Sequence, residues 1–118
     1  MFICGIKRIN TILYCRYWRP TVRFYQDVLG LSIHHQTKWL VEFHLMDESY
    51  LSIADAASTS IQSAGGNGIT LSWRVEDVTQ AHYNLNELGV KTSEIKPIWG
   101  MRAFYFSDPE GHRIELWS

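Results

Sequence analysis

Residues 106–118 of the sequence, FSDPEGHRIELWS, contain a turn between two stretches of strand-forming residues. Asp108 stands at the first turn position, Pro109 at the second and Gly111 at the fourth. The proline ring presets φ at its position, and glycine accepts the backbone geometry with which the chain leaves the turn. The stretch therefore predicts a β-hairpin that closes on a last strand.

That last strand carries a carboxylate between two apolar residues. Successive side chains of a strand point to opposite faces, so Ile114 and Leu116 share one face and Glu115 lies on the other. Arg113 and Trp117 share the face of Glu115. Glu115 is then either a solvated outer residue or the floor of a pocket, and the strand pattern leaves both alternatives open.

The size and charge of the chain limit the classes of function. A chain of 118 residues with 46% hydrophobic and 19% charged residues forms one globular domain, residues 1–118. A net charge of -1 offers no basic face to nucleic acid, and the apolar runs are too short to span a bilayer. Lys7 and Arg8 follow the N-terminal apolar stretch, the wrong order for a signal peptide. We expect a cytoplasmic protein that binds neither nucleic acid nor membrane, with Cys4 and Cys15 unpaired.

The pattern of predicted elements occurs twice along the chain. Unit one, residues 9–55, and unit two, residues 68–118, are separated by a small, polar, glycine-rich linker at residues 56–67. Unit one has a predicted strand at 9–16, a helix at 20–29, and strands at 31–36, 39–46 and 50–54. Unit two has a predicted strand at 68–75, a helix at 77–88, and strands at 90–95, 102–107 and 112–118. Each unit is a predicted βαβββ unit.

One face of each predicted sheet has no helix to cover it. In unit one the helix covers the face of Leu13, Leu51 and Ile53, so the other face must curve around the second unit, a ligand, or both. The open face of unit two carries the side chains of Thr70, Ser72, Arg74, Arg113, Glu115 and Trp117. This polar and aromatic set is more typical of a pocket wall than of a core.

Three segments carry a resemblance to a known superfamily. RFYQDVLGL at 23–31, VEDV at 75–78 and FSDPEGHRIEL at 106–116 resemble the glyoxalase, bleomycin-resistance and dioxygenase superfamily, the vicinal oxygen chelate proteins. The resemblance implies an α+β fold with two βαβββ units, curved mixed sheets around a cleft and helices on the outside. It also implies a homodimer. It does not name a reaction, because this fold hosts isomerases, dioxygenases, thiol transferases and metal-free drug-sequestering proteins.

The resemblance also implies where a metal site would lie. Metal enzymes of the superfamily place ligands on the first and last strands of each unit, and these positions fall on Asn10, Ser52, Thr70 and Glu115. Only Glu115 is a typical metal ligand, whereas a catalytic zinc commonly needs three protein donors. We therefore predict no metal and no other cofactor.

One alternative set of donors remains open for a divalent metal, namely Glu42, His44 and Glu115. It competes with a simpler interpretation, in which Glu42 and His44 are solvated on an exposed strand face. His34 and His35 are adjacent in a strand, so their side chains point to opposite faces and do not converge on one ion.

The predicted function is that of a small-molecule-binding protein that sequesters an aromatic or cationic compound. The expected ligand-binding residues are Asn10, Ser52, Thr70, Arg74, Trp99, Tyr105 and Glu115. Trp99 belongs to a predicted mobile flap, residues 95–102 with Gly100 as the hinge, and serves either a ligand or a subunit contact. Arg74 either points into the cleft or lies on the surface. The sequence assigns no catalytic residue, and the alternative function is a metal-dependent lyase, isomerase or dioxygenase of the same superfamily.

Overall fold

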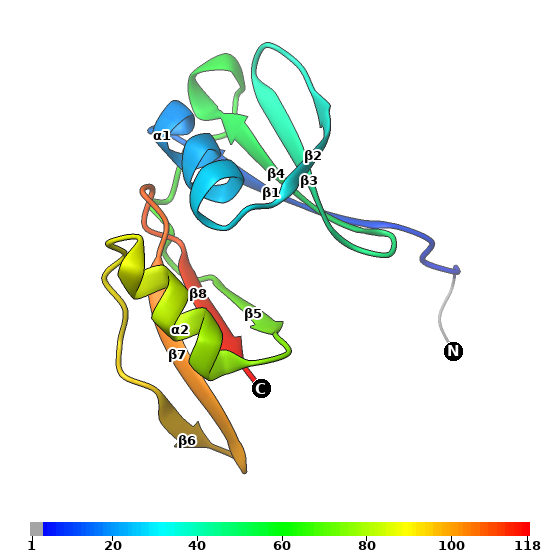
Figure 1. The fold of residues 1–118 in the computed structure, drawn as a ribbon. Helices are drawn as coiled ribbons and strands as arrows, with labels where there is room; N and C mark the ends of the chain where they lie inside the picture. Colours follow the sequence, from blue (N-terminus) through cyan, green and yellow to red (C-terminus); the bar gives the residue numbers. More distant parts are fainter. Residues whose placement is uncertain (1–3) are drawn as a thin grey trace. The chain divides into compact units, whose positions relative to one another are not determined.

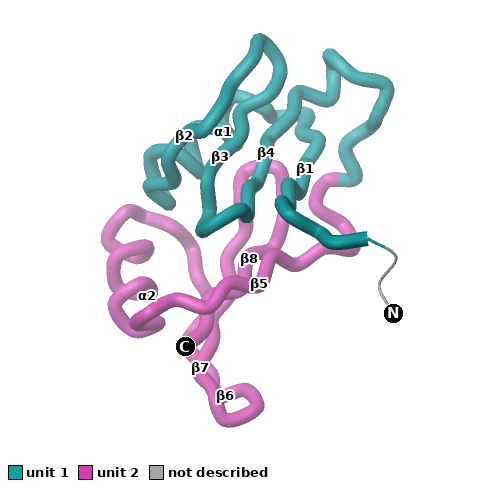
Figure 2. Tube along the Cα trace, turned by 90° about the vertical axis from the view of Figure 1, so that its right-hand side faces the viewer, with its two compact units in different colours: residues 1–64 teal, residues 65–118 magenta. Residues whose placement is uncertain are grey.

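The computed structural model describes residues 4–118 of the chain. The chain divides between Ala64 and Gly65 into two compact units, shown in teal and magenta in Figure 2. This boundary falls inside the predicted linker at 56–67, so residues 65–67 belong to the second unit. Among the described residues, no helix has the length and apolar character needed to cross a membrane.

The first unit is a βαβββ unit with one four-stranded sheet (Figure 1). Its elements are β1 (Ile9–Cys15), α1 (Trp18–Arg23) with a π-helical continuation (Phe24–Val28), β2 (Ser32–Gln36), β3 (Leu40–Met46), β4 (Ser49–Asp55) and a 3-10 turn (Ala56–Ser58). The strand order is β1-β4-β3-β2, in which β1 is parallel to β4 and the other pairs are antiparallel. The sheet is therefore mixed, as predicted.

The helix of the first unit covers one face of this sheet. Helix α1 begins two positions before the expected start at Pro20, which falls in its first turn, where the missing N–H leaves no hydrogen bond unmade. Leu13, Leu51 and Ile53 are buried on the helix side, in agreement with the predicted alternation. The side chains between them along the strands face the opposite, open side of the sheet.

The second unit repeats this arrangement within residues 65–118. Its elements are β5 (Thr70–Arg74), α2 (Val78–Glu87), β6 (Lys96–Ile98), β7 (Met101–Ser107) and β8 (Arg113–Trp117), in the sheet order β5-β8-β7-β6. The side chain of Asp77 caps α2 by accepting the Gln80 N–H at 3.1 Å, and Gly89 follows the helix with φ 82°. The predicted α+β fold of two βαβββ units with curved mixed sheets is confirmed.

The prediction of a strand at 90–95 is wrong. The strand that follows α2 is β6, which spans only Lys96–Ile98. The Oγ atom of Ser93 accepts the N–H of Tyr105 at 2.9 Å, while the N–H of Ser93 donates to the Tyr105 carbonyl at 2.9 Å. The hydroxyl of Ser93 thus takes the place of the backbone carbonyl that would accept the Tyr105 N–H in a regular β-sheet. Pro97, which has no N–H, restricts β6 to a short edge strand.

The segment expected to be a flap forms the β6–β7 hairpin. Ile98 pairs with Met101, and Trp99 and Gly100 form the tip with φ values of 52° and 79°. Both central residues of a tight hairpin turn have positive φ in the type I′ geometry, which glycine and asparagine accept readily. A tryptophan at such a position is uncommon.

The turn at 108–111 has the predicted hairpin role, with β7 antiparallel to β8. The Oδ1 atom of Asp108 accepts the N–H groups of Glu110, Gly111 and His112 at 2.9 to 3.0 Å. The buried His112 ring places Nδ1 2.7 Å from Asp108 Oδ2. A Cβ atom on Gly66 would lie only 2.2 Å from the Gly111 carbonyl, so glycine is required where the two backbones meet. His112 thus has a structural position in the turn.

Candidate functional site

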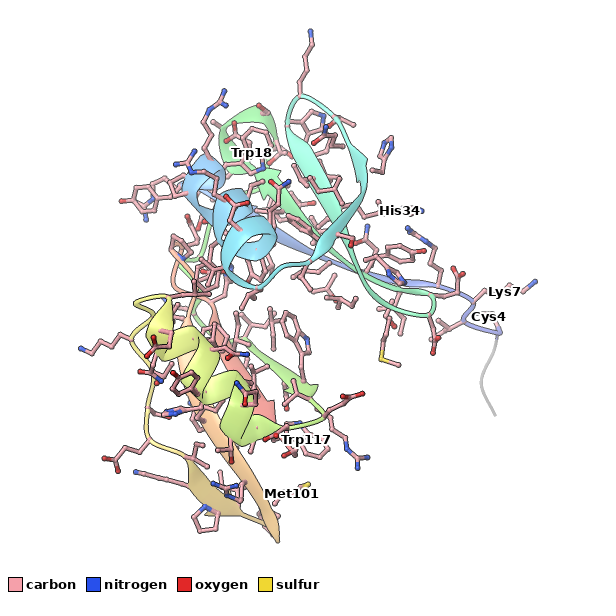
Figure 3. The ribbon with its side chains drawn as sticks, in the orientation of Figure 1. Cys4, Lys7, Trp18, His34, Met101 and Trp117 are labelled. Atoms are coloured by element: carbon pink, nitrogen blue, oxygen red, sulfur yellow. The ribbon has the colours of Figure 1, made fainter. Side chains whose placement is uncertain are left out.

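A pocket of about 330 Å³ lies on the open face of the second-unit sheet. Its lining comes from β5, β8, β7 and the β6–β7 hairpin tip, and consists of Ser72, Ile98, Trp99, Met101, Ala103, Tyr105, Glu115 and Trp117. Two of these side chains, Met101 and Trp117, can be followed in Figure 3. Strand alternation explains why these residues share a face. On β8 the side chains of Glu115 and Trp117 point into the pocket, while those of Ile114 and Leu116 point to the opposite face, where they are buried.

Glu115 is the charged centre of this pocket. In the sheet register it stands directly beside Ser72 on β5 and Tyr105 on β7. Its Oε1 atom accepts a hydrogen bond from Ser72 Oγ at 2.5 Å, and its Oε2 atom accepts one from the Tyr105 hydroxyl at 2.6 Å. The carboxylate is thus fixed in the middle of a row of three strands by one hydroxyl from each side.

These contacts set the protonation states in the pocket. The hydrogen bond from Ser72, followed by the one from Tyr105, lowers the pKa of Glu115 against the effect of burial, and the charge of Arg113 lowers it further. The bond to Glu115 raises the pKa of Tyr105. The carboxylate is therefore ionised and the phenol protonated at neutral pH. Because both hydroxyl hydrogens point at Glu115, the oxygens of Ser72 and Tyr105 offer only lone pairs to a ligand.

Aromatic rings form the walls around this carboxylate. Trp117 lines the pocket, and the Arg74 guanidinium lies 5.6 Å from the centre of its ring. Trp99 lines the pocket from the hairpin tip and remains 91% exposed. A ligand in the pocket would meet aromatic surface together with hydrogen-bond acceptors.

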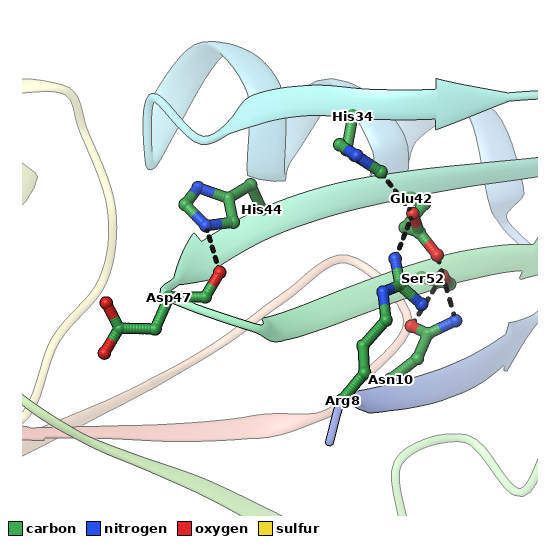
Figure 4. Close-up of polar contacts among 7 residues, drawn as sticks. All are labelled: Arg8, Asn10, His34, Glu42, His44, Asp47 and Ser52. Carbon is green, nitrogen blue, oxygen red and sulfur yellow. Dashed lines mark hydrogen bonds and ion pairs between the residues drawn. The ribbon is translucent and has the colours of Figure 1, made fainter.

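A second polar cluster lies on the open face of the first unit, around Glu42 (Figure 4). The Oε1 atom of Glu42 accepts from Arg8 Nη2 at 2.8 Å and lies 2.7 Å from Nδ1 of His34. Its Oε2 atom accepts from Asn10 Nδ2 at 3.2 Å, and Ser52 Oγ donates to Asn10 Oδ1 at 2.8 Å. This network joins β1, β2, β3 and β4 through one carboxylate.

The expectation that Glu42 is solvated is wrong, since only 7% of the residue is exposed. Burial raises the pKa of Glu42, but the hydrogen bonds from His34 and Arg8 and the charge of Arg8 outweigh it. The resulting pKa is below the ordinary value, so the carboxylate is ionised. His44, on the same face, has Nε2 2.8 Å from the Asp47 carbonyl oxygen.

His34 belongs to this cluster through the register of β2 against β3. Ile33 pairs with Phe43, and this register continued by one residue sets His34 opposite Glu42. The register then shifts at a bulge, after which His35 is the Cα partner of Glu42. Strand alternation did not predict this contact, because alternation gives the face of a residue and not the register between two strands. Arg8 was also missed, because it precedes the first strand and belongs to none of the motifs.

Comparison with known proteins identifies the family of the chain. The model of the Glyoxalase/Bleomycin resistance protein/Dioxygenase superfamily matches residues 7–116. The chain belongs to this superfamily. A relative, the uncharacterized protein YraH of Bacillus subtilis (strain 168), is 29% identical over 130 residues, covering 95% of this chain and 98% of YraH.

Solved structures show the same superfamily fold. The antibiotic binding protein TnmS3 from Streptomyces sp. CB03234 has a TM-score of 0.81 at 19% identity, covering 98% of this chain and 97% of TnmS3. Lactoylglutathione lyase from Agrobacterium tumefaciens has a TM-score of 0.77 at 21% identity, covering 96% of this chain and 93% of the lyase. A protein of unknown function from Agrobacterium tumefaciens str. C58 has a TM-score of 0.78 at 28% identity, covering 98% of this chain and 96% of that protein.

The structure does not bring all the predicted ligand-binding residues together in one pocket. Trp99, Tyr105 and Glu115 line the second-unit pocket together. Asn10 and Ser52 are bonded to each other at the Glu42 cluster of the first unit. The two remaining residues lie outside the lining of the pocket.

Those two residues are Thr70 and Arg74. Thr70 Oγ1 accepts from Arg113 Nε at 2.9 Å, so Ser72 instead of Thr70 is the β5 partner of Glu115. Arg74 lines a different hollow with Val75, Glu76 and Ser118, next to the β5 end.

The donors for a superfamily-type metal site are sparse. Within the described residues of each unit, no three side chains of His, Cys, Asp or Glu form a group that could hold an ion. Glu42 and His34 make a pair of donors, and Glu115 has hydroxyl neighbours that serve zinc or iron poorly. The residues present in each unit therefore do not fit the three-donor requirement of a catalytic zinc.

Proposed function

We propose that the chain is a small-molecule-binding protein that holds an aromatic or cationic compound in the second-unit pocket without a metal. The observation that carries the proposal is the environment of Glu115. Both of its oxygens accept from neutral hydroxyls, those of Ser72 and Tyr105, so hydrogen bonds fix the carboxylate without neutralising its charge. A cation placed against it would gain a charge-assisted hydrogen bond.

The remaining groups of the pocket favour the same class of ligand. The oxygens of Ser72, Tyr105 and Glu115 present lone pairs, which match N–H donors of a ligand and disfavour its carboxylates. Trp99 and Trp117 add aromatic faces, which attract cations and stack on planar rings. An aromatic amidinium or ammonium compound satisfies both requirements.

The backbone at the hairpin tip supports a ligand contact for Trp99. A tryptophan with φ 52° adopts a left-handed conformation that costs about 1–2 kcal/mol relative to the ordinary one. With 91% of its surface exposed, Trp99 recovers little of this cost through packing. A bound aromatic ligand would supply the missing contact area.

The comparison with TnmS3 supports the same class of function. This protein is described as an antibiotic binding protein, and it shares the fold of our chain over nearly the whole length. A small-molecule pocket on the same fold therefore has a precedent. The identity of the compound does not transfer at this level of similarity.

The second candidate function is that of a metal-dependent lyase, isomerase or dioxygenase. It is favoured by the position of Glu115 on the last strand of its unit and by the fold shared with lactoylglutathione lyase. Elemental analysis of the purified protein separates the two candidates. Close to one equivalent of Zn, Fe, Mn or Ni that Glu115→Ala releases would replace the metal-free proposal with this one.

Calorimetric titration with three matched probes tests the binding proposal. Benzamidinium, benzamide and benzoate share one ring and differ in charge. We expect the wild type to bind benzamidinium best and benzoate least, and we expect Glu115→Gln to weaken benzamidinium binding by about 1.5–3 kcal/mol. Glu87→Gln, which removes an exposed carboxylate from α2, is the matched control and should leave the affinity unchanged. Equal binding of all three probes, or binding indifferent to Glu115→Gln, would refute the role of Glu115.

We further propose that the chain forms a homodimer. The proposal rests on the pairing of units across subunits that the superfamily resemblance implies, and on the exposure of large apolar side chains such as Trp99. Sedimentation equilibrium at micromolar concentration tests it, with twice the chain mass as the expected result. A monomer under these conditions would reject the dimer and leave the pocket of the second unit as described.

A further inference from the structure

The Arg8 side chain lies in a cage of polar and aromatic groups on the first-unit sheet. The carbon at the centre of its guanidinium is 3.7 Å from the centre of the Tyr50 ring, and Nη2 donates to Glu42 Oε1 at 2.8 Å. The guanidinium thus stacks on an aromatic face and binds a carboxylate at its edge. These are the two contacts with which proteins bind a planar cation.

The walls of this cage come from the strands of the sheet, whereas Arg8 precedes β1. Glu42 comes from β3, Tyr50 from β4 and His34 from β2. Tyr50 is only 6% exposed, and the ring of His34 lies 4.8 Å from its ring. Asn10 donates to Glu42 from β1. Four strands therefore position the groups of the cage.

The group that fills the cage comes from a segment outside the sheet. Residues 4–8 form no helix or strand, and β1 begins only at Ile9. Ile6 is 64% exposed, so this neighbouring apolar side chain adds little packing to the segment. The Arg8 side chain itself is 39% exposed. Arg8 can therefore leave the cage by rotation of its side chain and of this short segment, without disrupting a strand pair.

We propose that the cage formed by Glu42, Tyr50 and His34 is a second cation-binding site, selective for guanidinium or amidinium groups, and that Arg8 occupies it as an internal competitor. An external cation would have to displace Arg8 from Glu42 and the Tyr50 face. A tethered group acts at an effective concentration on the order of millimolar, so Arg8 suppresses weak ligands without blocking strong ones. The cage belongs to the first unit, and the pocket at Glu115 belongs to the second.

The proposal is tested by replacing Arg8 and adding a small molecule with the same guanidinium group to the solution. Ethylguanidinium is the probe, ethylammonium tests the need for a planar cation, and N-ethylurea is the neutral planar control. Binding is followed through the NMR signals of the Tyr50 and His34 rings, with the Tyr105 signals reporting the other pocket separately. We expect Arg8→Ala to bind ethylguanidinium at least about tenfold more tightly than the wild type does at these signals, because the internal competitor is gone.

A second substitution identifies the carboxylate responsible. In the Arg8→Ala background, Glu42→Gln should remove most of the ethylguanidinium binding, whereas Glu115→Gln should leave the Tyr50 and His34 responses unchanged. Equal affinity of the wild type and Arg8→Ala, or a response that survives Glu42→Gln, would overturn the proposal. Tyr105 signals that respond equally with and without Glu115→Gln would instead contradict the function proposed for the second unit.

If the Arg8→Ala variant does not fold, the proposal is tested with the Arg8→Lys variant and with the wild type. Lysine retains the positive charge but lacks the planar fork, so it competes less well for Glu42 and Tyr50. We expect Arg8→Lys to bind ethylguanidinium more tightly than the wild type. In the wild type, saturating ethylguanidinium should shift the Nε–H signal of Arg8 toward that of a solvated arginine. An Nε–H signal that stays constant while the Tyr50 ring responds would contradict displacement.

Discussion

The two units share one βαβββ order but hold their open-face carboxylates with different partners. In the first unit Glu42 stands on β3 and contacts the guanidinium of Arg8. In the second unit Glu115 stands on β8 and contacts only hydroxyls through its two described hydrogen bonds, from Ser72 and Tyr105. A repeated fold thus carries two different sites. In the first unit a guanidinium of the same chain binds the carboxylate directly, whereas in the second Arg113 acts on Glu115 through its charge and a ligand is expected to supply the direct contact.

The hairpin tips of the two units show a parallel difference. Asp47, in the turn between β3 and β4, has φ 41°, and Trp99, between β6 and β7, has φ 52°. Aspartate tolerates the left-handed region through local hydrogen bonding, whereas tryptophan has no such compensation. The Asp47 carbonyl also contacts His44 at 2.8 Å. Local structure thus explains the positive φ of Asp47, whereas for Trp99 the explanation we propose is a contact with a ligand.

The largest expected difference between the units is in stability. Glu42→Ala should lower the free energy of unfolding by about 2 kcal/mol, because it removes a buried acceptor of three charge-assisted or polar hydrogen bonds. Glu115→Ala should lower it by about 1 kcal/mol, because its hydroxyl partners remain accessible to water. Urea denaturation of both variants measures the difference. If Glu115→Ala is the more damaging of the two, the assignment of a structural carboxylate to the first unit and a ligand-binding one to the second is wrong.

A smaller effect on stability is expected when the backbone strain at the β6–β7 hairpin tip is relieved. Trp99→Asn should raise the free energy of unfolding by about 1 kcal/mol, since asparagine accepts positive φ better than tryptophan does. The same change should weaken benzamidinium binding by removing an aromatic wall of the pocket. Asp47→Asn in the first unit is the control and should alter neither quantity much. A destabilised Trp99→Asn protein would show that Trp99 makes structural contacts at the tip.

The smallest effect concerns the acid limb of stability, where the two units should behave alike. The pKa values of Glu42 and Glu115 are both lowered from the ordinary 4.5. A lowered native pKa contributes stability that is fully present above the ordinary value and is lost as the pH falls through the native pKa. The melting temperature of the wild type should therefore fall more steeply below pH 4.5 than that of the Glu42→Gln, Glu115→Gln double variant. Parallel curves would mean that neither carboxylate is stabilised in its ionised form.

Local chemistry explains why the fold was predictable. The turn at 108–111 and the helix stops at Gly30 and Gly89 rest on backbone preferences that act over a few residues. Strand alternation then placed Glu115 and Trp117 on the open face of β8. These features need no knowledge of distant contacts.

The parts that were missed depend on contacts between distant segments. Ser93 replaces a ladder hydrogen bond with its side chain, and the register of β2 against β3 sets His34 beside Glu42. Arg8 reaches Glu42 from a segment without regular structure. Such contacts arise from the packed sheet, and no pattern of residue types along the chain encodes them.

The most direct test of the account compares both carboxylates in one sample. Carbon-13 NMR of the glutamate side-chain carboxyl groups, with Glu42 and Glu115 assigned by their Gln variants, is recorded as benzamidinium is added. The account predicts that the Glu115 signal shifts and saturates at benzamidinium concentrations that leave the Glu42 signal unchanged, because Arg8 competes for the site at Glu42. A shift of Glu42 with a constant Glu115 signal would contradict it, and so would two constant signals at concentrations that saturate binding.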